Sequence, residues 1–217
     1  EAIGFRGDRV FVTVEAGEGT DMRGYLVGGT ISADASEITL DTSNVAEIPL
    51  PFPSENHTDE ALIVTDDSVL TFFELNGADL NTAPAAQVFD FDLNNTGTLS
   101  FPHLEYRVTD AALASDGNLW VVNYFFPGDT DMLPKSDPLA EKYGEGATHA
   151  QQDQVERLVE LHLGVNGITL TEMAPIQLVL SDSDARNWEG LVLLDDRGFL
   201  LVTDKFPSTI LAFVELP

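Results

Sequence analysis

The chain has 217 residues, 43% of them hydrophobic, which is enough for one globular domain with its own core. Its 37 acidic and 10 basic residues give a formal net charge of −27, which repels nucleic acid and anionic lipid, and no apolar run approaches the ~20 residues that insert into a membrane. The absence of Cys excludes disulfides, thiolate metal sites and Cys nucleophiles.

Four segments repeat one pattern: an acidic residue, a small residue, an apolar strand, a tight turn and a second apolar strand. They are EAIGFRGDRVFVTVEA, DEALIVTDDSVLTFFELN, TDAALASDGNLWVVNYF and WEGLVLLDDRGFLLVTDKF. The turns are rich in Gly and Asp, which are typical of hairpin loops, as at Gly7-Asp8 and Asp116-Gly117. The sequence therefore predicts four β-hairpins.

Further strands are expected after the hairpins, in the ranges 24–31, 37–50, 86–91, 157–163, 168–173 and 209–216. Helix is expected only around 139–141 or 150–154. The acids that open the four units lie 59, 50 and 79 residues apart, close to the ~40–50 residues of a propeller blade. We predict a single all-β domain, a β-propeller with blades at 1–58, 59–108, 109–187 and 188–217. A β-sandwich is the alternative.

The last unit has only three strand candidates, while the first residue, Glu1, directly opens a unit. Propellers usually complete one blade with a strand from the other terminus. The sequence therefore suggests the C-terminal part of a longer propeller. A four-bladed ring with one incomplete blade is the alternative.

The opening acids and the ends of the second strands are expected to converge at one mouth of a central channel. The strand ends are Glu15, Glu74, Asn123 and Asp204. Facing carboxylates repel one another unless a cation neutralises them, and all-oxygen ligands suit Ca²⁺. The predicted metal ligands are Glu1, Glu60, Asp110, Glu189 and Asp204. In the alternative interpretation these acids accept hydrogen bonds from backbone amides and fix the packing of the blades.

Other polar residues lie near the same predicted mouth. The candidates for ligand binding are His57, Arg107, Asn123 and Lys205, with His103 and Asn187 nearby. The polar, Gly- and Pro-rich segment 125–154 is too irregular for a strand pair. It is expected to form either a wall or lid of a binding site or a plain surface insertion.

Two of the repeated segments, TDAALASDGNLWVVNYF and NWEGLVLLDDRGFLLVTDKFPSTILAFVEL, resemble blades of the bacterial esterase-like phytase-domain family. The shared features are the E-G-L opening, the Asp-containing turn and the L-L-V-x-D ending. The resemblance implies a ring of about six blades, a secreted or periplasmic setting, bound Ca²⁺ and hydrolysis of a phosphomonoester or carboxylic ester. It assigns Glu189 and Asp204 to the functional site.

Two functions from different classes follow. One is a calcium-dependent hydrolase of a small ester or phosphoester. The other is a non-catalytic propeller with structural calcium that binds a small molecule or a protein. The sequence contains neither a G-x-S-x-G nucleophile motif nor a cluster of Lys and Arg at the predicted mouth, which favours binding.

Overall fold

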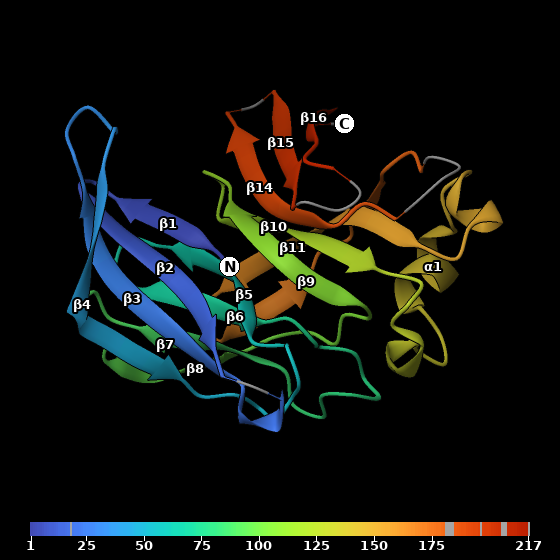
Figure 1. Ribbon diagram of the computed structural model, residues 1–217. Coiled ribbons are helices and arrows are strands. Elements are labelled where there is room, and N and C mark those ends of the chain that lie inside the picture. Colours follow the sequence, from blue (N-terminus) through green and yellow to red (C-terminus); the bar gives the residue numbers. More distant parts are fainter. Residues whose placement is uncertain (18, 181–184, 196, 205–207, 217) are drawn as a thin grey trace. The chain divides into compact units, whose positions relative to one another are not determined.

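The structure, a computed structural model, describes residues 1–17, 19–180, 185–195, 197–204 and 208–216 (Figure 1). The described strands form four antiparallel sheets. The chain divides into two compact units, each with two sheets. The first unit is Glu1–Glu74 with Ala83–Phe101, and the second is Leu75–Thr82 with Pro102–Pro217. Among the described residues, no helix has the length and apolar character needed to span a membrane.

The first unit holds two four-stranded meanders, in which strands that follow one another in the chain are paired. The first sheet comprises β1 (Ile3–Arg6), β2 (Arg9–Ala16), β3 (Arg23–Ile31) and β4 (Ile38–Ile48), with a short 3₁₀ helix, η1 (Gly19–Asp21), before β3. The second sheet comprises β5 (Asp59–Val64), β6 (Val69–Phe73), β7 (Ala85–Phe89) and β8 (Asn95–Ser100). Gly7 joins β1 to β2 with φ +63°, a backbone conformation that favours glycine.

The core of the first unit forms where its two sheets pack together. Phe11 and Leu26 of the first sheet contact Leu62, Val69 and Phe89 of the second. These side chains are fully or almost fully buried. Removal of this apolar surface from water is the main stabilising contribution to the unit.

The second unit contains a larger sheet and a smaller one. The larger sheet is ordered β12-β11-β10-β9, and β13 also pairs with β11. Its strands are β9 (Arg107–Leu113), β10 (Asn118–Phe125), β11 (Val155–Gly164), β12 (Gly167–Leu170) and β13 (Ile176–Gln177). The smaller sheet consists of β14 (Trp188–Leu194), β15 (Gly198–Thr203) and β16 (Leu211–Glu215).

A long insertion connects β10 to β11. It contains one short α-helix and two 3₁₀ helices: η2 (Thr130–Met132), α1 (Pro138–Tyr143) and η3 (His149–Gln151). Pro138 occupies the first turn of α1, and the Asp137 carboxylate caps that helix by accepting from the backbone N–H groups of Leu139 and Ala140. The insertion is therefore an ordered part of the second unit.

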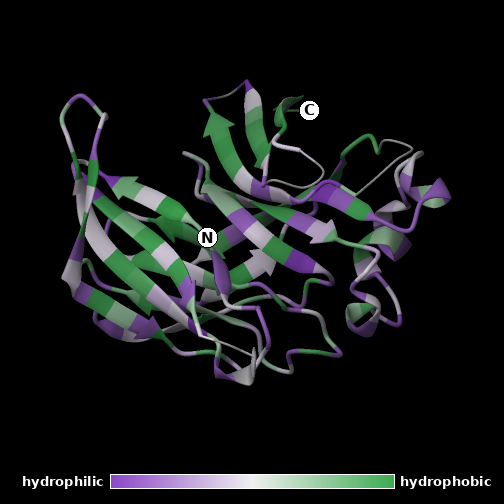
Figure 2. Ribbon diagram, viewed as in Figure 1, coloured by the Kyte–Doolittle hydropathy of each residue, from purple (hydrophilic) through white to green (hydrophobic). Residues whose placement is uncertain are grey.

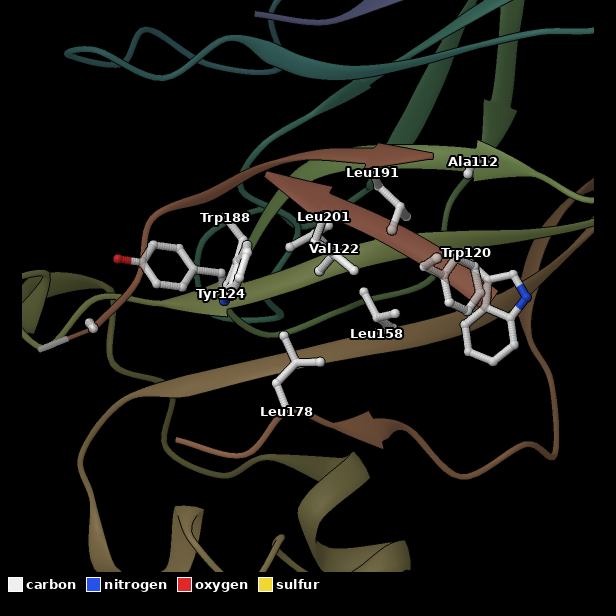
Figure 3. Close-up of a cluster of buried hydrophobic side chains, with 11 residues drawn as sticks. Ala112, Trp120, Val122, Tyr124, Leu158, Leu178, Trp188, Leu191 and Leu201 are labelled. Carbon is white, nitrogen blue, oxygen red and sulfur yellow. The ribbon is translucent and has the colours of Figure 1, made fainter. Parts of the chain in front are cut away.

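An aromatic-rich core joins the two sheets of the second unit (Figure 3). Trp120 of β10 and Phe199 of β15 pack with their ring centroids 5.1 Å apart. Leu158 of β11 and Trp188 of β14 belong to the same cluster. The hydropathy colouring in Figure 2 shows that β14 and β15 are mostly apolar, as strands packed against a second sheet require.

Each of the four sheets begins, in chain order, with the first strand of a predicted hairpin. Three of these strands, β5, β9 and β14, contain a β-bulge near the predicted channel mouth. The bulged residues are Glu60 between Asp59 and Ala61, Thr109 between Val108 and Asp110, and Glu189 between Trp188 and Gly190. A bulge locally reverses the alternation of side chains along a strand. Asp110 is therefore displaced by one position from Glu60 and Glu189, although the sequence pattern aligns the three acids.

The predicted all-β class is confirmed, and the sheets have the meander construction of propeller blades. A ring of about six blades remains a prediction. The apolar residues of β5 are mostly buried, whereas Ile3 and Phe5 of β1 are 49% and 48% exposed. The sequence analysis also missed β8, which is polar and largely exposed.

Candidate functional site

A cavity of about 190 Å³ lies at the ends of three strands in the second unit. The described residues that line it are Arg107 at the start of β9, Tyr124 near the end of β10, Phe126 just beyond it, and Asn187 immediately before β14. We call this the Arg107 cavity. It combines a guanidinium and an amide with two aromatic rings.

An ion pair with the insertion fixes the position of Arg107. Its Nε donates to Oδ2 of Asp129 at 2.9 Å, and its Nη2 forms an ion pair with the same oxygen, also at 2.9 Å. Both side chains are mostly shielded from water, so this pair is held more firmly than an exposed one. The guanidinium is therefore preorganised at the wall of the cavity.

Tyr124 links the cavity to the hydrophobic core. Its ring belongs to the core cluster, and Figure 3 shows its hydroxyl directed away from the apolar side chains. Burial raises the pKa of Tyr124, so the phenol stays protonated and can donate a hydrogen bond at neutral pH. Phe126 packs against the same core. The apolar side of the cavity is thus rigid.

Asn187 brings one of the predicted metal ligands to the edge of the cavity. Its Nδ2 donates to Oε1 of the bulged Glu189, and its backbone oxygen accepts from the N–H of Asp204. Glu189 is partly buried, whereas Asp204 is exposed. The structure therefore places Arg107, Asn187, Glu189 and Asp204 in one region of the second unit.

The segment that carries Asn187 is held by a buried carboxylate on β11. Glu156 is 1% exposed, accepts from the Nε of Arg186 at 2.8 Å and forms an ion pair with its Nη2 at 2.7 Å. It also accepts from the backbone N–H of Arg186 at 2.9 Å and from the Trp188 indole N–H at 2.6 Å. This network joins the larger sheet to the beginning of the smaller one.

Asp110 forms a second link between these two sheets. Its carboxylate accepts from the backbone N–H groups of Ala111 and Leu191, at 2.8 and 2.6 Å. Beside it, the Thr109 hydroxyl donates to the backbone oxygen of Trp188. Burial raises the pKa of Asp110 to about 7. These contacts agree with the alternative interpretation, in which the acid that begins each repeated unit accepts hydrogen bonds from backbone amides and thereby fixes the packing of the blades.

Asn123 lies fully buried behind the cavity. Its amide donates to the backbone oxygens of Glu105 and Arg107, at 2.8 and 3.0 Å. Its Oδ1 accepts from Nε of Arg157 at 2.8 Å. All these contacts position the first residues of β9 and a buried guanidinium on β11.

The remaining predicted site residues belong mostly to the first unit. Glu1 is exposed and its amino group donates to the backbone oxygen of Thr13. Glu60 is the partly buried bulged residue of β5. His57 precedes β5, with Nδ1 2.8 Å from the Ser54 hydroxyl. Lys205 lies outside the described residues.

A buried acid that the sequence analysis did not single out lies next to Glu60. Asp59 is 1% exposed, and its Oδ1 accepts from the Thr71 hydroxyl at 2.7 Å. Its Oδ2 is also buried and has no hydrogen-bond partner among the described residues. Burial raises the pKa of Asp59 to about 7.

The predicted calcium site requires several oxygen ligands that face one another. Within the described ranges, no three His, Cys, Asp or Glu side chains are grouped as metal ligands. In the second unit, N–H donors already engage Asp110 and Glu189. The contacts described within each unit therefore do not form a calcium site, and calcium remains a prediction.

No protein-family model matches this chain, and no curated protein is significantly similar to it. The functional argument therefore depends on the cavities of the second unit and the groups that line them.

Proposed function

We propose that this chain is a non-catalytic binding module of propeller type that takes up a small organic molecule in the Arg107 cavity. The proposal is based on one observation: a fixed guanidinium, an amide and two aromatic side chains line the same cavity. Cavities that combine apolar walls with a few polar groups are typical of small-molecule sites.

The lining indicates the chemistry of the ligand. Arg107 and Asn187 carry N–H donors, and the neutral Tyr124 phenol adds an O–H donor. Tyr124 and Phe126 offer apolar surface on the other side. A molecule with an apolar body and an oxygen-accepting edge, such as a carboxylate or an ester, is complementary to this arrangement.

A calcium-dependent ester or phosphoester hydrolase is the second candidate. The observation that favours it is that an ester fits the same lining, beside Glu189. The resemblance to the esterase-like phytase-domain family, with its secreted or periplasmic setting, supports this candidate. Binding is preferred because N–H donors already engage the nearby acids.

Benzoate is a suitable probe because it has an apolar ring and a carboxylate edge. We expect calorimetry to give a Kd of about 1 mM or tighter for benzoate, and no comparable binding of benzylamine, whose charge is opposite. Replacing Arg107→Gln should weaken benzoate binding about tenfold or more. Arg23→Gln, which changes an exposed arginine of the first unit, is the matched control.

Because Arg107→Gln also releases Asp129, Asn187→Ala provides a second variant that leaves this ion pair unchanged. Equal binding of benzoate and benzylamine, or unchanged affinity in both variants, would contradict the proposal. Turnover of p-nitrophenyl acetate or p-nitrophenyl phosphate with calcium, but not with chelator, would instead establish the hydrolase.

A further inference from the structure

A second cavity of the second unit, about 220 Å³ in volume, is lined by the insertion and the larger sheet. The lining residues that matter here are Tyr106, Asp137, Gln152, Gln154, Arg157 and Gln177. We call it the Gln154 cavity. At ~30 Å³ per water molecule, its volume corresponds to about seven waters, the space of one ring-sized ligand.

A buried ion pair gives this cavity a fixed wall. Arg157 on β11 is 2% exposed and donates through Nη1 and Nη2 to the two carboxylate oxygens of Asp137, at 2.6 and 3.2 Å. Its Nε donates to Asn123. Asp137 in turn caps α1, so a single carboxylate holds the insertion to the sheet. The guanidinium is consequently neutralised and preorganised.

Three glutamine amides line the cavity without hydrogen bonds. Gln154 is only 7% exposed, yet no described residue forms a hydrogen bond with its side-chain amide. The same holds for the amides of Gln152 and Gln177 within the described part of the chain. Because the buried side-chain atoms without a hydrogen-bond partner among the described residues include none from these glutamines, the amides are open to the cavity. Each of these amides offers two donors and one acceptor to a ligand.

The charges around the cavity disfavour an anionic ligand. Asp137 already neutralises Arg157, and two further acids in the lining, Glu145 and Asp153, are exposed. A phosphate or carboxylate would approach these acids without a free cation to receive it. A hydroxyl group is neutral and both donates and accepts, so it matches an amide.

Tyr106 adds an aromatic side to the lining. Its ring packs 5.2 Å from that of Phe125 and 5.5 Å from the Arg157 guanidinium, which holds it in place. Burial raises its pKa to about 12, so it is a neutral phenol at physiological pH. A rigid aromatic group beside several amides can contact both the C–H face and the hydroxyl edge of a sugar ring.

We propose that the Gln154 cavity is a binding site for a neutral polyhydroxylated ligand, namely a single sugar ring. The site is separate from the Arg107 cavity and does not depend on its function. It would bind through the unpartnered glutamine amides, with Tyr106 as the aromatic wall.

The test is titration of the intact chain, by calorimetry or ligand-observed NMR, with glucose, galactose, N-acetylglucosamine and myo-inositol. We expect at least one to bind, and glucose 6-phosphate to bind more weakly than glucose because of Glu145 and Asp153. Gln154→Leu, which keeps the side-chain volume and removes the amide, should weaken binding about five- to tenfold. Gln151→Leu is the matched control, because Gln151 is exposed and does not line the cavity.

Circular dichroism melting of each variant verifies that it is folded. If Gln154→Leu unfolds, Gln177→Leu repeats the measurement with a residue that is only partly buried. Three results would overturn the proposal: no binding of any of the four neutral probes, affinity that is unchanged in folded variants, or tighter binding of the diamine putrescine than of any sugar. The last result would identify a cation site at Glu145 and Asp153.

Discussion

Buried carboxylates in the two units differ in the number of hydrogen-bond donors around them. In the second unit, Glu156 accepts three hydrogen bonds from Arg186 and Trp188 and forms an ion pair with the Arg186 guanidinium, and Asp137 accepts from Arg157 and from two backbone amides. In the first unit, Asp59 is equally buried but has a single hydroxyl donor. A buried charge is stable only when several donors compensate for its lost hydration.

This difference has a physical consequence for each unit. In the second unit, Glu156 and Asp137 form ion pairs with Arg186 and Arg157 and hold structural elements together. Asp59 lacks a positively charged partner among the described residues, so burial raises its pKa to about 7. Removal of Arg157 should therefore destabilise the second unit strongly, whereas Asp59 should make the stability of the first unit depend on pH.

The largest effect is expected from Arg157→Met. The change leaves the Asp137 carboxylate and the Asn123 amide without their main donor in a shielded site. We expect urea denaturation to show a loss of about 3–5 kcal/mol in the free energy of unfolding. Arg23→Met, at an exposed ion pair, is the control and should leave the midpoint unchanged. A loss under about 1 kcal/mol for Arg157→Met would show that the buried pair does not hold the insertion.

The next effect is a pH-dependent gain from Asp59→Asn. Because the pKa of Asp59 rises from 3.8 to about 7 on folding, its contribution to stability is fully present below pH 3.8 and is lost as the pH rises through 7. The asparagine variant should thus be more stable than wild type at pH 8, by at most about 4 kcal/mol, and should lose this advantage near pH 4.

Asp34→Asn is a suitable control for the Asp59 experiment. Hydrogen bonds from Ser32 and Ser36 lower the pKa of the exposed Asp34 to about 2. The contribution of the Asp34 carboxylate to the stability of the folded state is present above pH 3.8 and is lost only as the pH falls through 2. Thermal melts of both variants from pH 4 to 8 should show a pH-dependent difference from wild type for Asp59→Asn alone. Parallel curves for Asp59→Asn and wild type would show that Asp59 is ionised in the folded protein.

Calcium should produce a smaller stabilisation, and its removal tests the predicted role of Glu189 as a metal ligand. At a hundredfold excess over its Kd, an ion that binds only the folded state adds about 2.7 kcal/mol. We expect a chelator to lower the Tm of the wild type, and Glu189→Gln to remove most of this response. Glu37→Gln, at an exposed acid, should retain it. An equal calcium response in both variants would remove Glu189 from the predicted site.

Local sequence patterns predicted the hairpins because the turns determine them. Gly117, with φ +87°, shows the backbone conformation that the Asp116-Gly117 turn requires, and the flanking apolar runs became β9 and β10. The helix near 139–141 was predicted as well and is α1. The bulges were not predicted, because the residues that follow Glu60 and Glu189 are uniformly apolar, so the sequence does not show where the alternation of side chains reverses.

The sequence predicted only some of the residues of the candidate site. Arg107 and Asn187 were singled out because they flank predicted strand starts, and the insertion was expected to form a wall. Tyr124 and Phe126 resembled ordinary strand residues. The pairing of Arg157 with Asp137 joins residues from different elements, and no local pattern specifies such a contact.

The dual role of Asp137 has a consequence for hydrogen exchange. Its carboxylate holds the amides of Leu139 and Ala140 as well as the Arg157 guanidinium. Opening of α1 alone would leave that guanidinium buried without its counterion, so the insertion should not fray independently of the sheet. The amides of Leu139 and Ala140, although they lie in the first turn of a six-residue helix, should therefore exchange with deuterium at rates close to those of β11.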